Sequence, residues 1–333
     1  MPHILAVTAP FFALVLLGWA VARIRMLPLD AIPGLNAFVL FFALPCMLFR
    51  FSASTPIAAQ LDAAVVTVYL GSALMVVALA VLVARRRAMG WADASFGALV
   101  AAFPNSGFMG VPLVVALLGP AAAAPAIVAL ALDMVLTTSL CIALSQLGHG
   151  ASGSSSEARA ALARALRGMR TNPLPWAIAL GMLSSATGLR PPGPLMLAVD
   201  MLAGAASPVA LFALGCMLAR SQLTPLSPRA ARGVPGLVAC KLVLHPLVVF
   251  AAGRIALAAG MALDPFFAVV LVLVAALPSA SNVPMLAERS HADAGRIARV
   301  VFFSTVGAFV TFTAVAAWIG AAGVAPAALR HGG

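Results

Sequence analysis

The strongest constraint on this chain is a series of long apolar segments that recur from one end to the other. A helix of about 20 apolar residues crosses the hydrocarbon core of a bilayer. Of the 333 residues, 63% are hydrophobic and 9% are charged, whereas soluble domains carry roughly 25% charged residues. The pattern predicts an all-α integral membrane protein.

Ten transmembrane helices are predicted, and the arginines predict their orientation. Alternate connections hold 15 arginines on one side of the membrane and 4 on the other. Because basic loops stay in the cytoplasm, the chain should lie in the cell membrane with both termini outside the cytoplasm. The predicted spans cover residues 3–22, 33–51, 62–84, 94–118, 124–146, 173–190, 195–219, 234–257, 265–287 and 298–320.

An internal repeat divides the chain into two five-helix halves, residues 1–146 and 173–333. FFALPCMLFR at 41–50 and LFALGCMLAR at 211–220 are identical at seven of ten positions. Since five is odd, the second half must enter the membrane inverted relative to the first. Residues 147–172 join the halves as a cytoplasmic linker, and their arginine-rich part fits either a short basic helix on the inner leaflet or a solvated segment.

The fourth and ninth spans are interrupted at matching places. FPNSGFMGVP at 103–112 and LPSASNVP at 277–284 put proline, glycine, asparagine and serine inside apolar runs. Irregular backbone at membrane depth survives where it is buried in protein or lines a cavity, and matched broken helices are typical of secondary transporters with a site at the midplane. The alternative is that these residues only kink the two helices.

If the two broken helices cross, they form a binding site for an anion, because the N-terminal end of a helix carries partial positive charge. The helix breaks are assigned to Pro104, Gly110, Pro112, Pro278 and Pro284. The substrate-binding residues are expected to be Asn105, Ser106, Gly107, Ser279, Ser281 and Asn282.

Three ionisable residues lie inside predicted spans, where such groups are costly and usually functional. Asp133 lies in span five, and Lys241, the only lysine, lies in span eight four residues before His245. Both Asp133 and Lys241 can reach the middle third of the membrane and form a charge pair. The alternatives are that Lys241 extends to the inner interface and that His245 serves in helix packing.

Several other functions are excluded or disfavoured by the sequence. The net charge of +11 comes from loop arginines and does not indicate nucleic-acid binding. No HExxH or GxSxG motif is present, and the nine acidic residues are scattered, so neither an enzyme nor a metal site nor a cofactor is expected.

The motif AAFPNSGFMGVPL at 101–113 resembles the signature of the auxin efflux carrier family of membrane transporters. SPVALFALGCML in span seven, Lys241 ahead of His245-Pro246, and LPSASNVPMLAE in span nine are similar to that family too. The resemblance implies two inverted five-helix repeats with crossed fourth and ninth spans, a panel domain from spans one, two, six and seven, and elevator-like motion. It also implies organic-anion substrates, with Pro104, Asn105, Pro112, Pro278, Asn282 and Pro284 at the crossovers.

The favoured function is a secondary active carrier that moves a small organic anion, such as a carboxylate, by alternating access. Its expected partners are that anion and the lipid bilayer, while proton coupling and a homodimer stay open. No acidic residue lies near either crossover, which disfavours a sodium-coupled symporter like the bile acid carriers. A non-transporting sensor or structural membrane protein is the alternative from another class.

Overall fold

The computed structural model describes residues 2–56, 62–147, 173–222 and 233–321. Within these ranges the regular elements are helices, joined at one place by an isolated β-bridge. Almost all of the predicted linker, residues 148–172, lies outside the described residues, so its helix stays a prediction.

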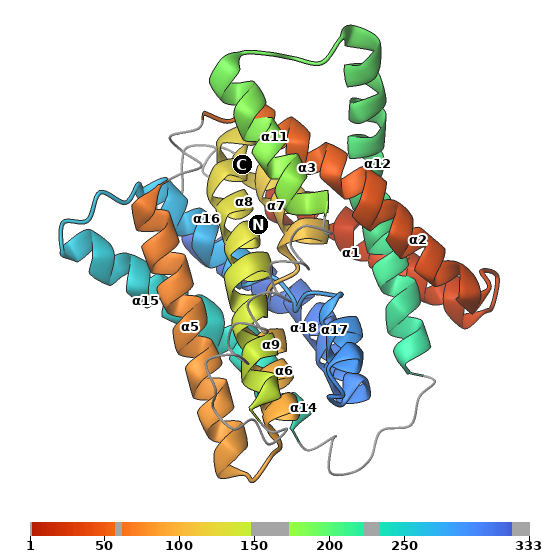
Figure 1. Cartoon of the computed structure of the whole chain (residues 1–333), viewed down its shortest axis with the longest axis vertical. Coiled ribbons are helices and arrows are strands. Elements are labelled where there is room, and N and C mark those ends of the chain that lie inside the picture. Colours follow the sequence, from red (N-terminus) through yellow and green to blue (C-terminus); the bar gives the residue numbers. More distant parts are fainter. Residues whose placement is uncertain (1, 57–61, 148–172, 223–232, 322–333) are drawn as a thin grey trace.

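One group of helices, here called the panel, is coloured red and green in Figure 1. Within it, α1 packs along α12, and α3 contacts both α11 and α12. The panel consists of α1 (Pro2–Arg23), η1 (Leu29–Ala31), α2 (Ile32–Phe38), η2 (Val39–Ala43), α3 (Leu44–Ser54), α11 (Pro173–Thr187) and α12 (Gly193–Ser221). The two copies of the ten-residue repeat lie on η2–α3 and on α12, and these elements contact each other.

The remaining helices form a second group, here called the crossover block, which holds both interrupted spans (Figure 1). Its first part is α5 (Ala63–Arg86), α6 (Trp91–Ala102), η3 (Ser106–Gly110), α7 (Val111–Leu118), η4 (Pro120–Ala122), α8 (Ala123–Leu132), η5 (Asp133–Thr137) and α9 (Thr138–Gln146). Its second part is α14 (Val234–Ala239), η6 (Cys240–Leu244), α15 (His245–Ala258), α16 (Pro265–Ala275), α17 (Val283–Arg289) and α18 (Ala294–Ala321).

The described residues include seven continuous helices that are long and apolar enough to cross a membrane. They correspond to predicted spans one, two, three, five, seven, eight and ten. Spans four and nine are broken where expected, between α6 and η3 and between α16 and α17. Span six corresponds to the shorter α11. The chain is therefore helical as predicted, while the total of ten spans and their inverted arrangement stay predictions.

Three prolines each follow a turn of π-helix. Pro45, Pro112 and Pro246 stand two residues beyond η2, η3 and η6, so the residue four positions back is the middle of each π turn. A proline donates no hydrogen bond, and its ring clashes with the carbonyl four residues back. The wider i→i+5 turn gives that ring room, which explains why these helices continue through their prolines.

The contact between α1 and α12 depends on glycine at two positions. A Cβ added to Gly18 would lie 2.0 Å from the carbonyl oxygen of Phe212, and one added to Gly215 would lie 2.0 Å from that of Val15. The Cys216 Sγ also donates a hydrogen bond of 3.2 Å to the Gly18 carbonyl. Close backbone approach through small residues is how helices associate in lipid, where no hydrophobic force drives them together.

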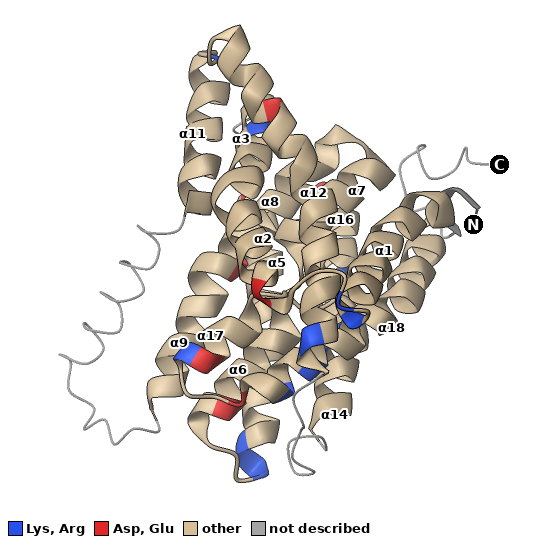
Figure 2. Cartoon of the chain, turned by 90° about the vertical axis from the view of Figure 1, so that its right-hand side faces the viewer, with Lys and Arg blue, Asp and Glu red and all other residues tan. Residues whose placement is uncertain are grey.

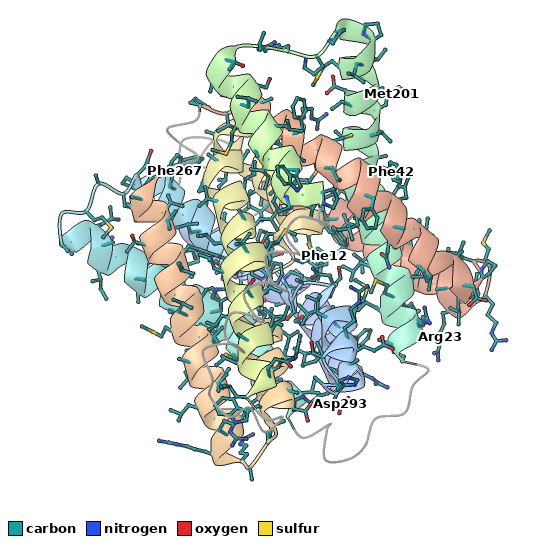
Figure 3. All side chains as sticks on the ribbon, in the orientation of Figure 1. Phe12, Arg23, Phe42, Met201, Phe267 and Asp293 are labelled. Carbon is teal, nitrogen blue, oxygen red and sulfur yellow. The ribbon has the colours of Figure 1, made fainter. Side chains whose placement is uncertain are left out.

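The surface of the molecule fits a lipid environment. Phe42 and Met201 lie on the outer side of the panel (Figure 3), and their side chains are 58% and 71% exposed. Figure 2 shows that most of the basic residues gather toward one end of the molecule. Such a distribution is typical of a membrane protein whose basic end lies in the cytoplasm.

We expect Gly215→Ala to lower the melting temperature of the purified protein by several degrees. Overpacking of this kind costs about 1–3 kcal/mol, and the Val15 carbonyl is backbone that cannot rotate away. Gly204→Ala on the same helix is the matched control, because a Cβ there meets nothing within 4 Å. In a helix that change is favourable by up to about 1 kcal/mol. Equal melting temperatures for the two variants would contradict the close packing of α1 on α12.

Candidate functional site

The two interrupted segments meet and pair with each other. Pro104 and Ser279 form an antiparallel bridge. The Asn105 N–H donates to the Pro278 carbonyl at 2.8 Å, and the Ala280 N–H donates to the Phe103 carbonyl at 2.9 Å. These four backbone groups would be unsatisfied if either segment faced lipid alone. The expectation that the broken helices lie together is confirmed by this pairing.

A serine from one segment replaces a hydrogen bond that a proline removes from the other. Helical geometry would have Val100 accept from the N–H of residue 104, but Pro104 has none. The Ser279 hydroxyl donates to the Val100 carbonyl instead, at 2.7 Å. The backbone N–H of Ser279 in turn donates to the Ser304 hydroxyl on α18, at 3.1 Å. Ser279 therefore locks α6, the second crossover and α18 together.

A cavity of about 100 Å³ lies beside this crossing, between the panel and the crossover block. Its walls combine both groups of helices, and none of its lining residues is charged. The lining residues are Asn36, Leu40, Leu44, Leu174 and Met217 from the panel, and Phe103, Pro104, Asn105, Gly107, Phe108, Leu130, Met134, Ala280, Ser281, Asn282 and Met285 from the block.

The polar groups of the cavity include a donor that no described residue accepts from. Asn105 is 3% exposed, and its Nδ2 has no hydrogen-bond partner among the described residues. Asn105 precedes a 13-residue helical segment, Ser106–Leu118, whose second and third residues, Gly107 and Phe108, also line the cavity. An amide donor and the positive end of a helix thus meet at the same wall.

Several carbonyls at the negative ends of the half-helices accept hydrogen bonds from other segments, in contrast to this positive end. At the end of α6, the Val100 and Phe103 carbonyls accept from Ser279 and Ala280. At the end of α16, the Ala275 carbonyl accepts from Lys241 Nζ at 2.8 Å. Because the carbonyl ends already have donors, the local electrostatics around the cavity favour an anion over a cation.

The structure brings most of the predicted binding residues together. Asn105, Gly107, Ser281 and Asn282 line the cavity. Ser106 and Ser279 are fully buried and do not line the cavity. The Ser106 hydroxyl donates to the Pro104 carbonyl at 3.3 Å, and the Ser279 hydroxyl donates to the Val100 carbonyl.

The residues predicted to break the helices are also placed by the structure. Pro104 and Pro278 lie in the paired segments, and Pro112 and Pro284 are the second residues of α7 and α17. Gly110 lies against the second crossover, because a Cβ there would be 2.5 Å from Leu277 Cδ1.

The predicted ionisable residues are all fully buried in the crossover block. Lys241 Nζ lies 2.9 Å from His245 Nδ1, so this lysine does not extend to the interface. The Asp133 carboxylate accepts from the Tyr69 hydroxyl at 2.6 Å and from the Thr137 hydroxyl at 3.1 Å. Lys241 and Asp133 thus bind different partners and make no direct ion pair in the described part of the chain.

Sequence reasoning missed the panel side of the cavity. Asn36 on α2 lines it and donates from Nδ2 to the Met217 sulfur of α12, at 3.1 Å. An asparagine inside the apolar run of span two was a visible signal for this position. Met217 carried no such signal, because methionine is common in apolar helices.

Two comparisons with known proteins bear on the family of this chain. A family described as membrane transport protein matches residues 3–316. A protein from Rhizobium meliloti (strain 1021), named "Putative malonate transporter", is 31% identical to this chain over 317 residues. The match covers 94% of this chain and 95% of that relative.

We expect Ser279→Ala to destabilise the protein, because it leaves the buried Val100 carbonyl without its donor. A buried polar group without a partner costs about 1–3 kcal/mol. Ser281→Ala is the control, since that hydroxyl lies two residues away and makes no hydrogen bond to the described residues. Thermal unfolding of both purified variants tests the assignment, which fails if Ser281→Ala is the more damaging change.

Proposed function

We propose a transport function from one premise: this chain belongs to the membrane transport protein family, the family of the auxin efflux carriers. It is an integral membrane protein of a family of transporters rather than enzymes. We infer that it is a secondary active carrier whose substrate is a small organic anion bound at the crossing of the two broken spans.

The observation that carries this proposal is the unpartnered donor of Asn105 at the start of the η3–α7 helix. A buried N–H group without an acceptor is costly, and a carboxylate oxygen would supply the acceptor while also meeting the positive end of the helix. Asn282 and Ser281, on the facing segment, add further polar atoms to the same cavity. The apolar remainder of the wall favours a substrate with a short carbon skeleton.

The size of the cavity supports a substrate of a few heavy atoms. Pockets for drug-sized ligands occupy about 300–1,000 Å³, whereas this one measures about 100 Å³. The relative from Rhizobium meliloti is named for malonate, which is a dicarboxylate of this size. Malonate is therefore the first substrate to test.

The position of the cavity supports alternating access by an elevator-like movement. Its walls are shared by the panel and the crossover block, so a displacement of the block along the panel would carry the substrate from one side to the other. A direct polar contact between the two groups is the long hydrogen bond from Ser207 of α12 to the Phe108 carbonyl, 3.5 Å. The basic end of the molecule would face the cytoplasm.

We expect malonate to raise the melting temperature of the purified protein, because a ligand that binds only the folded state stabilises it by mass action. A screen of dicarboxylates and indole acids, across pH and with or without sodium, would identify the substrate class. The absence of stabilisation by any small carboxylate would contradict the proposed site.

We expect Asn105→Ala and Asn282→Ala to abolish or strongly reduce malonate counterflow in liposomes while folding and insertion stay intact. A hydrogen bond to a charged group contributes about 1.5–3 kcal/mol, so each change should cost at least about tenfold in apparent affinity. Thr67→Ala, on the exposed face of α5, is the control and should transport normally. Near-normal counterflow in both asparagine variants would refute this binding site.

A further inference from the structure

A buried polar cluster lies in the crossover block, next to the cavity but outside its lining. It consists of Tyr69 on α5, Asp133 and Thr137 on η5, Lys241 on η6 and His245 on α15, all fully buried. Tyr69 and Thr137 donate to the Asp133 carboxylate, and the Lys241 Nζ lies within hydrogen-bond distance of the His245 Nδ1. The Tyr69 and His245 rings lie 6.3 Å apart, centroid to centroid, and connect the two halves of the cluster.

Burying these ionisable side chains costs free energy, which indicates that the cluster has a function. Ionisable residues inside membrane spans are rare and mark ion pathways or binding sites. The charges of Asp133 and Lys241 interact electrostatically. Each side chain nevertheless makes its hydrogen bonds to other partners. Within the described part of the chain the His245 Nε2 has no hydrogen-bond partner, which is a further cost. A purely structural role would be served more cheaply by apolar side chains.

The cluster is joined through the chain to both halves of the proposed substrate site. Asp133 lies next to Met134 and one turn beyond Leu130, and both of those residues line the cavity. Lys241 donates to the Ala275 carbonyl, which ends α16 three residues before Pro278 of the crossover pair. A positive charge at the C-terminal end of a helix stabilises that end. Any change of charge in the cluster therefore acts on the segments that hold the substrate.

Few other titratable groups can interfere with this cluster. Cys141 of α9 and Cys240, the neighbour of Lys241, face it closely enough for electrostatic interaction. On the other elements packed against it, described charged side chains lie near helix ends or are exposed: Arg85 and Arg86 of α5, Asp93 of α6, Arg254 of α15, and Arg296 and Arg299 of α18.

We propose that this cluster is the binding site for a co-transported proton, with the Asp133 carboxylate as the acceptor and Lys241 as the fixed positive charge beside it. The inference rests on the proposed function and names its coupling ion. With Asp133 ionised and Lys241 protonated, the pair is neutral overall. One proton on Asp133 leaves a net charge of +1, which offsets one of the two negative charges of a small dicarboxylate in a cavity whose own lining has no cation.

The test uses the full-length protein in liposomes, with radiolabelled malonate and the membrane potential held at zero. Counterflow at equal pH on both sides needs no net proton movement and tests the proposed function by itself. Net uptake driven by a gradient of one pH unit, acid outside, tests the coupling. One proton per substrate predicts about tenfold accumulation, since one pH unit is worth 1.36 kcal/mol. Uptake into protein-free liposomes is subtracted.

We expect Asp133→Asn and Lys241→Met to exchange malonate more slowly and to lose the accumulation driven by the pH gradient. Asp264→Asn is the matched control: its carboxylate caps the start of α16 and is exposed, so its accumulation should equal that of the wild type. Wild-type counterflow without any response to the pH gradient would overturn the inference and leave the proposed carrier standing. Full accumulation in Asp133→Asn would overturn it as well.

A second measurement needs no substrate. It tests the proton site even if Asp133→Asn, or the wild type itself, shows no malonate exchange. Infrared difference spectra of the reconstituted protein, recorded as the pH is lowered, detect protonated carboxylic acids. The wild type and Asp264→Asn should gain the band of a buried acid that Asp133→Asn lacks. Identical acid bands in all three proteins, over the pH range in which they stay folded, would show that Asp133 takes up no proton.

Discussion

The pairing of the two broken spans is the interaction on which the rest of this structure depends. Lipid offers no partner for the backbone groups freed at Pro104 and Pro278, so neither interruption could exist alone at membrane depth. Each satisfies the other through the bonds between Asn105 and Pro278 and between Ala280 and Phe103. This requirement brings together two segments from opposite halves of the chain, and it places an irregular polar backbone beside the cavity.

The same requirement for hydrogen-bond partners gives the site its electrostatic character. Side chains from other elements cover the carbonyls at the ends of the half-helices, Ser279 for Val100 and Lys241 for Ala275. The donor of Asn105 has no such partner in the ranges that the structure describes. A site without charged residues can therefore favour anions. Since Lys241 belongs to the buried cluster, that helix end is also where the proposed proton site and the proposed substrate site would influence each other.

Much of the fold was predictable because it depends on local chemistry. Apolar runs marked the helices, and proline, glycine and asparagine at 103–112 and 277–284 marked the two breaks. The candidate site was predictable in part. Asn105, Gly107, Ser281 and Asn282 line one cavity, and Asn36 enters it from the panel. Its place depends on how α2 packs against segments far away in the chain, which no local pattern reports.

The sequence by itself determined that the chain is helical and apolar enough for a membrane, where two of its spans break, and which polar residues are available there. Tertiary structure decided what each polar group does. Ser279 bonds to a carbonyl 179 residues away in the chain, and Lys241 binds the end of α16 and His245 rather than Asp133. The physical reason is that helix formation and helix breaking follow from neighbouring residues, whereas the partner of a buried donor depends on which distant segments the packing brings within hydrogen-bond distance.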